Sequence, residues 1–448
     1  MTFAPFHLSV LTSCLGYTYS YLSPDNFALS EAKVRNGTLG PNGPAYKALV
    51  ITSNSNLTLD GVHYIQRYAR AGLPVILSGG DPGAYATHDG RDTLAMQKAI
   101  QTLKQSQNVY TVAAGQVAAK LETLGLQPRV AVRTNGTWYS TWREDAQNAT
   151  DHAFVFCENN ASNGTVSIAS AKTPFFLDPW TGERKPVLHY SRQAGRVVIP
   201  LQLASNQTVV IGFSGSDHGL SQHVTQLPSN VLGYSYAAET GATLHVSASK
   251  SSESLVLSNG TRVSVHSKEI AKARPLTNWT LTAEHWEAPH NLSDASVVAN
   301  KRNSTHHLSE LVSWTQIAGL KNASGVGHYQ TAFSWTGSSA DGAYLELPAI
   351  AHGARVYLNG HRLPPVDLAR PRADLGPYLQ QGSNRVVVVV PTTMWNYIRS
   401  IADHIKSSGT AVETVMAGIG ITTLPPRGEN GLIGTVRLVP YARQRLAV

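Results

Sequence analysis

The period of the hydrophobic residues changes near residue 128, and this change divides the chain into an α/β part and an all-β part. Before residue 128, short apolar runs that are typical of buried strands lie at 47–54, 73–80 and 108–114. Segments with apolar residues at helical spacing follow them at 57–72, 91–106 and 116–126. Repetition of strand and helix at this spacing predicts parallel strands joined by right-handed crossovers. We therefore expect an α/β domain over residues 30–128, preceded by a connector over residues 1–29.

Beyond residue 128 the apolar residues alternate with a period of two, which predicts antiparallel strands separated by turns. We expect a small β-sandwich accessory domain over 129–215, an irregular β-rich segment over 216–307 and a third β domain over 308–448. In the third domain, Asn359–Gly360 favours a two-residue type I′ turn, because both residues tolerate a positive φ. The run VVVVV at 386–390 predicts a central strand that is buried on both faces. The fold class is thus α/β plus all-β, ending in a jelly-roll sandwich.

A glycine-rich loop, SGGDPGAY at 78–85, follows one of the predicted parallel strands, as the phosphate-binding loop of a nucleotide-binding Rossmann domain would. It contains neither G-x-G-x-x-G nor G-x-x-x-x-G-K-[ST], and five residues (86–90) separate it from the helix expected at 91–106. We therefore interpret the α/β domain as Rossmann-like in topology but as a scaffold, and we expect no cofactor.

The distribution of charged and apolar residues argues against nucleic-acid and membrane partners. The net charge is +8, but the 36 basic residues are spread along the chain without a clustered basic stripe. No run of about 18 apolar residues is present, so we expect no membrane span.

The two cysteines, Cys14 and Cys157, lie far apart in the sequence and form no metal-binding C-x-x-C pair. Whether they form a disulfide is left open by the sequence.

Sequons for N-glycosylation indicate the secretory pathway. Twelve N-x-S/T motifs occur, at Asn36, Asn56, Asn135, Asn148, Asn160, Asn163, Asn206, Asn259, Asn278, Asn291, Asn303 and Asn322. One such motif means little, but twelve predict an extracellular glycoprotein. The first sixteen residues lack the basic start and the unbroken apolar core of a signal peptide. We therefore expect that the true N-terminus lies upstream and that the connector is truncated.

The stretch FFLDPWTGERKPVLHY at 175–190 gathers carboxylates, basic groups, an indole and a histidine. Hydrolysis of a glycosidic bond needs two carboxyl groups about 5–9.5 Å apart, and Asp178 and Glu183 could meet that condition across a turn. Asp-Pro followed by Trp-Thr-Gly is, however, also turn chemistry, in which the aspartate accepts hydrogen bonds from nearby backbone amides. We favour a β-hairpin turn over a catalytic pair.

Histidines and glutamates also cluster at 283–290 and 306–310, in the stretches AEHWEAPH and HHLSE. Their candidate ligands are His285, Glu287, His290, His306, His307 and Glu310, but no H-E-x-x-H motif holds them on a helix. We expect solvated or hydrogen-bonded side chains and no metal. A serine nucleophile in GFSGSDHG (212–219) is equally unsupported, since the stretch lacks G-x-S-x-G.

The C-terminal motifs resemble a known domain. G-x-Y-x-x-x-F (327–333), L-x-L-P (345–348), V-Y-L-N-G (356–360), the stretch DLGPYLQQGSNRVVVVV (374–390) and GLIGTVRL (431–438) follow one another in the order of the galactose-binding-like jelly roll. Domains of this kind are appended to many glycoside hydrolases of the β-galactosidase and rhamnosidase type.

A second resemblance covers almost the whole chain, from about residue 16 to 442. The segments GYTYSYLSPDNFAL (16–29), WRED (142–145), DHAFVFCENN (151–160), FFLDPWTGERKPV (175–187) and VVIPLQLASNQTVVIGFSG (197–215) are similar to the region after the barrel in family 106 α-L-rhamnosidases. In that family the catalytic carboxylates lie on a (β/α)₈ barrel of about 250 residues. The chain has no room for such a barrel before its α/β part, so no catalytic residue is assigned from the resemblance.

Three functions follow as hypotheses. The first is a non-catalytic accessory region of a secreted α-L-rhamnosidase-like glycoside hydrolase that acts on plant-type polysaccharide, serving as scaffold and contacting carbohydrate. The second is a free-standing extracellular carbohydrate-binding protein, and the third is an active glycoside hydrolase with an unrecognised carboxylate pair. Because sugars are bound by aromatic faces and planar polar groups, the candidate contacts are Trp335, Tyr357, Asn359, Trp395 and Asn396. The alternative for these side chains is a place in the core or in an interface.

Overall fold

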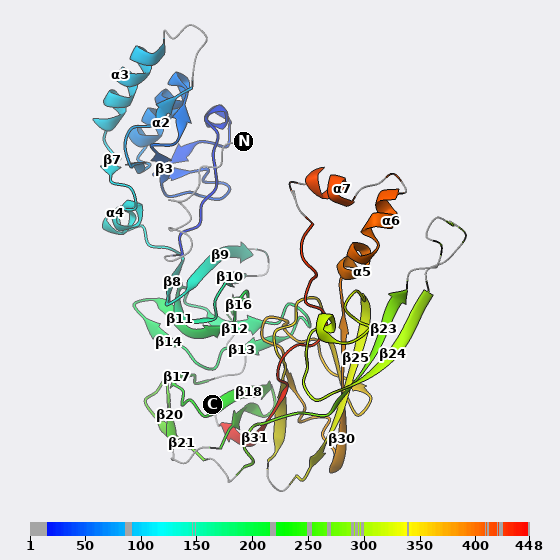
Figure 1. Cartoon of the computed structure of the whole chain (residues 1–448). Coiled ribbons are helices and arrows are strands. Elements are labelled where there is room, and N and C mark those ends of the chain that lie inside the picture. Colours follow the sequence, from blue (N-terminus) through cyan, green and yellow to red (C-terminus); the bar gives the residue numbers. More distant parts are fainter. Residues whose placement is uncertain are drawn as a thin grey trace. The chain divides into compact units, whose positions relative to one another are not determined.

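The computed structural model divides the chain into two compact units, residues 1–172 with 192–215, and residues 173–191 with 216–448 (Figure 1). It describes residues 16–85, 92–145, 147, 149–215, 221–248, 253–266, 270–287, 291, 294, 296, 300–337, 340–407, 409, 412–418, 420 and 424–446.

The first unit begins with the predicted parallel α/β layer. Its sheet has the order β3-β5-β7, formed by Leu49–Thr52, Val75–Ser78 and Val109–Val112, with all neighbours parallel. Three helices accompany it, namely α2 (Leu59–Arg70), α3 (Asp92–Lys104) and α4 (Val117–Thr123) (Figure 1). The short elements around this layer are η1 (Pro24–Ala28), β1 (Val34–Arg35), β2 (Thr38–Leu39), β4 (Asn56–Leu57) and β6 (Gly83–Ala84).

Alternation along the central strand β5 explains why helices lie on both faces. Val75 and Leu77 are packed in one core with α2 and α3, whereas Ile76 is packed on the opposite face with α4. Helix α2 begins after Thr58, whose hydroxyl accepts a hydrogen bond from the Gly61 amide, and it ends before Gly72 at φ 90°. The expected alternation of strands and helices is therefore confirmed.

The rest of the first unit is a small sandwich of antiparallel strands. One of its sheets contains β16-β10-β9 and the other β14-β15-β11-β8. Their bounds are β8 Val130–Thr134, β9 Thr137–Asp145, β10 Thr150–Glu158, β11 Ser162–Ala169, β14 Ser191–Gln193, β15 Arg196–Leu203 and β16 Thr208–Ser214. The indole of Trp138 on β9 donates a hydrogen bond of 2.8 Å to the hydroxyl of Ser162 on β11, which joins the two sheets.

The second unit is dominated by a larger sandwich. One sheet has the order β24-β23-β25-β30-β27-β28. Its strands are Asn300–Leu308, Trp279–Glu287, Gly325–Trp335, Gly382–Pro391, Arg355–Leu358 and His361–Arg362. The other sheet has the order β18-β19-β31-β26-β29, with β22 also paired to β31. These strands are Val231–Ala237, Gly241–Val246, Arg437–Leu446, Gly342–Glu346, Arg372–Asp374 and, for β22, Arg274–Pro275.

One hydrophobic core fills the space between these two sheets. Leu281, Tyr329 and Val388 contribute to it from one sheet, and Leu345 and Leu438 from the other. The segment 216–307, which the sequence sets apart as irregular, supplies β18, β19, β22, β23 and nearly all of β24 to this sandwich. Residues 173–191, expected within 129–215, belong to the second compact unit.

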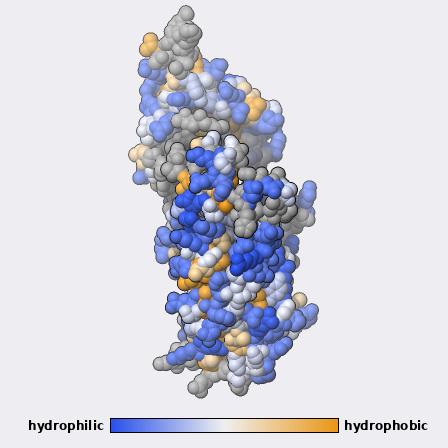
Figure 2. Space-filling view, turned by 45° about the vertical axis from the view of Figure 1, so that its right-hand side comes forward, coloured by the Kyte–Doolittle hydropathy of each residue, from blue (hydrophilic) through white to orange (hydrophobic). Residues whose placement is uncertain are grey.

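Smaller elements complete the second unit. They are β12 (Thr173–Leu177), β13 (Arg184–Pro186), the three-stranded sheet β17-β20-β21 (Val224–Gln226, Glu253–Leu257, Arg262–Val265), η2 (Trp314–Gln316), α5 (Trp395–Ser400), α6 (Ala402–Ser407) and α7 (Val412–Gly418). On the side shown in Figure 2, hydrophobic residues form small, separated patches among hydrophilic ones.

Candidate functional site

The outer face of the sheet β24-β23-β25-β30-β27-β28 carries a hollow of about 570 Å³. Its lining residues come from three neighbouring strands and one turn, and they are His328, Tyr357, Asn359, Gly360, Arg385, Val387 and Val389. The register explains why they meet, because His328 lies opposite Val389 and Tyr357 lies opposite Val387. Side chains that are opposite each other on neighbouring strands point to the same face of a sheet. This volume falls within the range of ligand sites, about 300–1,000 Å³.

The hollow corrects the prediction for the valine run. Val386, Val388 and Val390 are buried, whereas Val387 and Val389 are only partly buried and form part of the hollow. Strand β30 is central, as expected, but it is buried on one face alone. A sequence of five valines looks the same in both cases, because a β-branched residue suits either face of a strand.

Two of the five sugar-contact candidates lie at this hollow. Tyr357 is half-buried on β27. Asn359 forms the predicted turn with Gly360, at φ 53° and 85°. The Asn359 side chain accepts a hydrogen bond of 2.9 Å from the backbone amide of Arg385 and donates one of 2.9 Å to the carboxamide oxygen of Asn384. Asn359 therefore holds the turn beside the hollow, while Tyr357 contributes a phenol ring to its lining.

The other three candidates lie elsewhere. Trp335 is 9% exposed and belongs to the core between the two sheets. Asn396 is 1% exposed, and its carboxamide is bonded to both the amide and the carbonyl of Gly428, at 2.8 and 2.9 Å. Trp395 donates a hydrogen bond of 2.8 Å to the carbonyl of Pro426. The structure therefore does not gather the five candidates into one site.

Sequence reasoning missed the basic residues around the hollow. Arg385 contributes to its lining, Arg355 lies opposite Val389, and Arg362 lies opposite Tyr357. All three arginines are exposed. In the sequence they are scattered over thirty positions, and only the pairing of β27 with β28 and β30 brings them together. Alternation of Arg355 with the apolar residues Val356 and Leu358 was the available signal.

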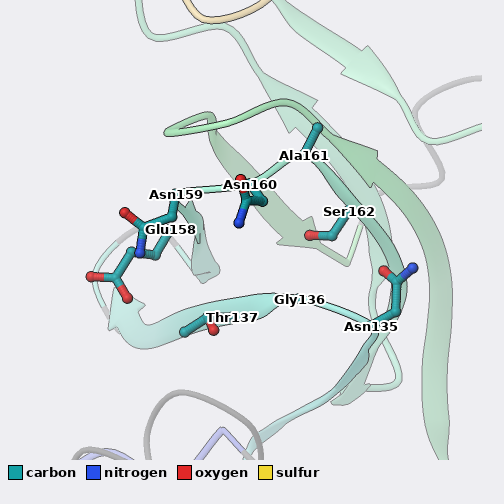
Figure 3. A pocket seen from close by; sticks show the side chains of 8 residues that line it. All are labelled: Asn135, Gly136, Thr137, Glu158, Asn159, Asn160, Ala161 and Ser162. Atoms are coloured by element: carbon teal, nitrogen blue, oxygen red, sulfur yellow. The ribbon is translucent and has the colours of Figure 1, made fainter.

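A second hollow, of about 320 Å³, lies in the first unit between two turns (Figure 3). Its lining is polar and consists of Asn135, Gly136, Thr137, Glu158, Asn159, Asn160, Ala161 and Ser162. The Glu158 carboxylate accepts a hydrogen bond of 3.2 Å from the Tyr139 hydroxyl. One carboxylate and no aromatic face give this hollow neither an acid–base pair nor a surface for a sugar ring.

The stretch 175–190 forms the expected hairpin. Phe175 pairs with Pro186 and Leu177 with Arg184. The Asp178 carboxylate accepts hydrogen bonds from the amides of Trp180 and Thr181, at 2.7 and 3.2 Å, and Gly182 takes φ 75°. Asp178 therefore shapes the turn, as predicted.

Lys185 lies on β13, the return strand of this hairpin, and has a perturbed pKa. Its ammonium group donates a hydrogen bond to the carbonyl of Tyr234 and lies 3.9 Å from the centroid of that ring. Burial lowers the pKa of Lys185 to about 8, although Glu183 and Asp374 act in the opposite direction. The carbonyl and the ring of Tyr234, on strand β18, contact this group, so it is a packed structural cation.

The histidine and glutamate stretches lie on the paired strands β23 and β24. Glu284 pairs with Lys301 at 2.8 Å and Glu287 with Arg302 at 3.0 Å. The His306 imidazole lies 3.0 Å from the Ser304 hydroxyl, and burial lowers its pKa. Among the residues that the structure describes, no three His, Cys, Asp or Glu side chains are close enough to hold a metal ion. His290 lies outside the described residues.

The glycine-rich loop and the cysteine have structural contacts. Gly79 and Gly80 take φ 78° and 126° after β5, and Asp81 pairs with Lys104 at 2.9 Å. Cys157 is buried, with its sulfur 3.2 Å from the carbonyl oxygen of Asn160. Cys14 lies outside the described residues, as does part of 212–219.

The sequon asparagines share one property. All of them within the described part of the chain are exposed, namely Asn36, Asn56, Asn135, Asn160, Asn163, Asn206, Asn259, Asn278, Asn291, Asn303 and Asn322. Asn148 lies outside the described residues. The buried asparagines are Asn230, Asn384, Asn396 and Asn430, and none of them starts an N-x-S/T motif. Every helix in the described part of the chain is too short or too polar to cross a membrane.

Comparison with solved structures identifies a similar fold. The chain is similar to a rhamnosidase from Novosphingobium sp. PP1Y, with a TM-score of 0.58 and 18% identity over 96% of this chain and 37% of that one. A β-glycosidase from Bacteroides vulgatus (TM-score 0.22, 17% identity, 38% of this chain and 20% of that one) is much less similar. The same holds for a β-glucuronidase from Bifidobacterium dentium (0.25, 19%, 39% and 31%). No family model and no curated protein matches the sequence.

The chain thus shares the fold of part of a rhamnosidase and spans little more than a third of that protein's length. At this level of identity the likeness shows the fold alone. What the site does has to be argued from its own residues.

Proposed function

We propose that this chain is an accessory region of a secreted glycoside hydrolase of the family 106 α-L-rhamnosidase type, and that it binds carbohydrate. In this proposal a Rossmann-like domain (30–128) is followed by a small sandwich and by a galactose-binding-like jelly roll that includes strands from the segment 216–307. The fold shared with a rhamnosidase over 96% of the chain supports it, together with the motifs that resemble that family.

The observation that carries the proposal is the hollow on β25, β30 and β27. The Tyr357 ring and the side chains of Val387 and Val389 provide an apolar surface within it. Around them lie an imidazole, from His328, and a guanidinium, from Arg385. Sugar rings have apolar C–H faces and polar edges, so a site for them combines an aromatic platform with planar polar groups.

The hairpin at 175–190 supports a role in binding rather than hydrolysis. A retaining or inverting glycosidase needs two available carboxyl groups. The Asp178 carboxylate is already bonded to two backbone amides of its own turn. The exposed sequon asparagines support secretion and glycosylation as part of the same proposal.

The test uses the purified full chain with oligosaccharides from plant cell-wall polysaccharides and an aryl α-L-rhamnoside. Calorimetry follows binding, and release of the aryl group follows hydrolysis. We expect saturable binding that Tyr357→Ala abolishes and that the control Tyr85→Ala, which removes an exposed tyrosine of the first unit, leaves unchanged. Turnover that is lost in Asp178→Ala or Glu183→Ala would contradict the accessory role. Binding that is unaffected by Tyr357→Ala would exclude this hollow as the site.

A further inference from the structure

We propose that the ligand of this hollow is an anionic saccharide, one that bears carboxylate groups as uronate residues do. The inference rests on the proposed function, namely that the hollow binds sugar, and adds the chemical class of that sugar. The evidence for this class of ligand is the positive charge around the hollow.

Three arginines from three neighbouring strands lie on the face of the sheet that carries the hollow. Arg385 on β30 contributes to the lining of the hollow. Arg355, on β27, lies opposite Val389 in the register, and Arg362, on β28, lies opposite Tyr357. Directly opposed residues have Cβ atoms about 4.5–5.5 Å apart. Both arginines therefore extend from positions next to lining residues, on the same face of the sheet.

These guanidinium groups are not neutralised by neighbours. Among the described residues no carboxylate forms an ion pair with Arg355, Arg362 or Arg385. The glutamate on the same face, Glu284, lies on β23, two strands away from β30, and already pairs with Lys301. At about 4.8 Å per strand, β23 and β30 are roughly 10 Å apart, which exceeds the Debye length of about 8 Å in physiological salt. The half of the face formed by β30, β27 and β28 is therefore positively charged.

A hydrogen-bond network fixes the backbone of Arg385 at the edge of the hollow. The amide and carbonyl of Arg385 are bonded to the carboxamide oxygen and amide of Asn359, each at 2.9 Å. Asn384 is fully buried and is bonded to Asn359, Gln380 and Gly382. The backbone of Arg385 is thus held relative to the Tyr357 strand before a ligand arrives, which lowers the entropic cost of binding.

An acidic sugar fits this combination better than a neutral one. Arginine binds a carboxylate through two parallel hydrogen bonds, and such charge-assisted bonds are about twice as strong as neutral ones. Tyr357, Val387 and Val389 can cover the C–H face of the pyranose ring while the arginines hold the carboxylate at its edge. A neutral sugar would use the same apolar surface and leave three positive charges without partners.

The test compares four ligands on the full chain: oligogalacturonate, its methyl ester, a neutral galactan oligosaccharide and a sulfated oligosaccharide. We expect oligogalacturonate to bind at least about tenfold more tightly than its methyl ester, because esterification removes the charge and keeps the ring. Affinity for oligogalacturonate should fall with added salt. Arg385→Ala and Arg362→Ala should each weaken it by about tenfold. The control Arg262→Ala removes an exposed arginine from the separate β17-β20-β21 sheet and should change nothing.

Each outcome decides something. Equal binding of the acid, the ester and the neutral sugar, lost in Tyr357→Ala, would overturn the anionic class and leave the proposed function intact. Absence of binding to every saccharide would overturn both. Tighter binding of the sulfated sugar than of the uronate would show a general polyanion surface and contradict carboxylate recognition. Loss of affinity in Arg262→Ala equal to that in Arg385→Ala would reduce the effect to net charge and also overturn the inference.

Discussion

The His245 Nδ1 atom and the Tyr344 hydroxyl oxygen lie 2.6 Å apart in the second unit and share a hydrogen bond. The same imidazole is stacked on the Tyr441 ring, with centroids 4.1 Å apart and planes inclined by 2°. Its Nε2 atom is buried and has no hydrogen-bond partner within the described part of the chain. The imidazole of His245, on β19, is thus held as a neutral ring by Tyr344 of β26 and Tyr441 of β31.

A pH dependence of stability follows from this arrangement. Burial lowers the pKa of His245 to about 4, against about 6.5 in an unfolded chain. Between these values the unfolded state binds a proton that the folded state does not. The free energy of unfolding should therefore be highest above pH 6.5 and fall as the pH drops toward 4, by up to about 1.4 kcal/mol per pH unit.

Urea denaturation of the chain at several pH values between 4 and 7.5 measures this slope. His245→Gln should flatten it, while His361→Gln, at an exposed position of the same unit, should not. A slope that is equally steep in His245→Gln would assign the effect to other groups.

The hydrogen bond between Tyr441 and Asp374 gives a second prediction. The Tyr441 hydroxyl donates a hydrogen bond of 2.6 Å to the Asp374 carboxylate, which also accepts one of 2.9 Å from the Gly376 amide. Tyr441→Phe keeps the ring and removes the first of these bonds from a partly buried charge. We expect a loss of about 1–3 kcal/mol in the free energy of unfolding. Tyr357→Phe, on the outer face, should cost less than about 0.5 kcal/mol by the same chemical denaturation. Equal costs would contradict the role of the Asp374 contact.

Local signals in the sequence predicted the local structure well. The Asn359–Gly360 turn and the Asp178 turn each depend on one or two residues with a strong backbone preference, so their geometry follows from the sequence alone. The parallel direction of β3, β5 and β7 follows from the spacing of strands and helices. Long-range register is different, because nothing near Arg355 in the sequence indicates that Val389 lies opposite it. The hollow could therefore not be assembled before the structure was known.

The different burial of neighbouring valines in β30 can be tested by measuring the stability of two variants. Val388 is fully buried, whereas its neighbour Val387 lies on the outer face. Val388→Ala removes two methyl groups from the core and should lower the free energy of unfolding by roughly 1.5–3 kcal/mol. Val387→Ala removes the same groups from a half-covered surface and should cost less than about 1 kcal/mol, while weakening saccharide binding. Thermal or urea unfolding of both variants measures the contrast, and equal losses would mean that β30 is covered on both faces.

Glycosylation at the exposed sequons is the last prediction. Expression in a eukaryotic secretory host with an added leader should give a product heavier than the polypeptide. Treatment with an N-glycanase should return its mass to 48.1 kDa plus any tag. Asn303 lies on the edge strand β24, on the same face as the hollow but at the opposite side of the sheet. A glycan there would leave the arginines open, so Asn303→Gln should remove one glycan without changing affinity for oligogalacturonate. A secreted product that shows no mass shift with the enzyme would contradict the prediction from the twelve motifs.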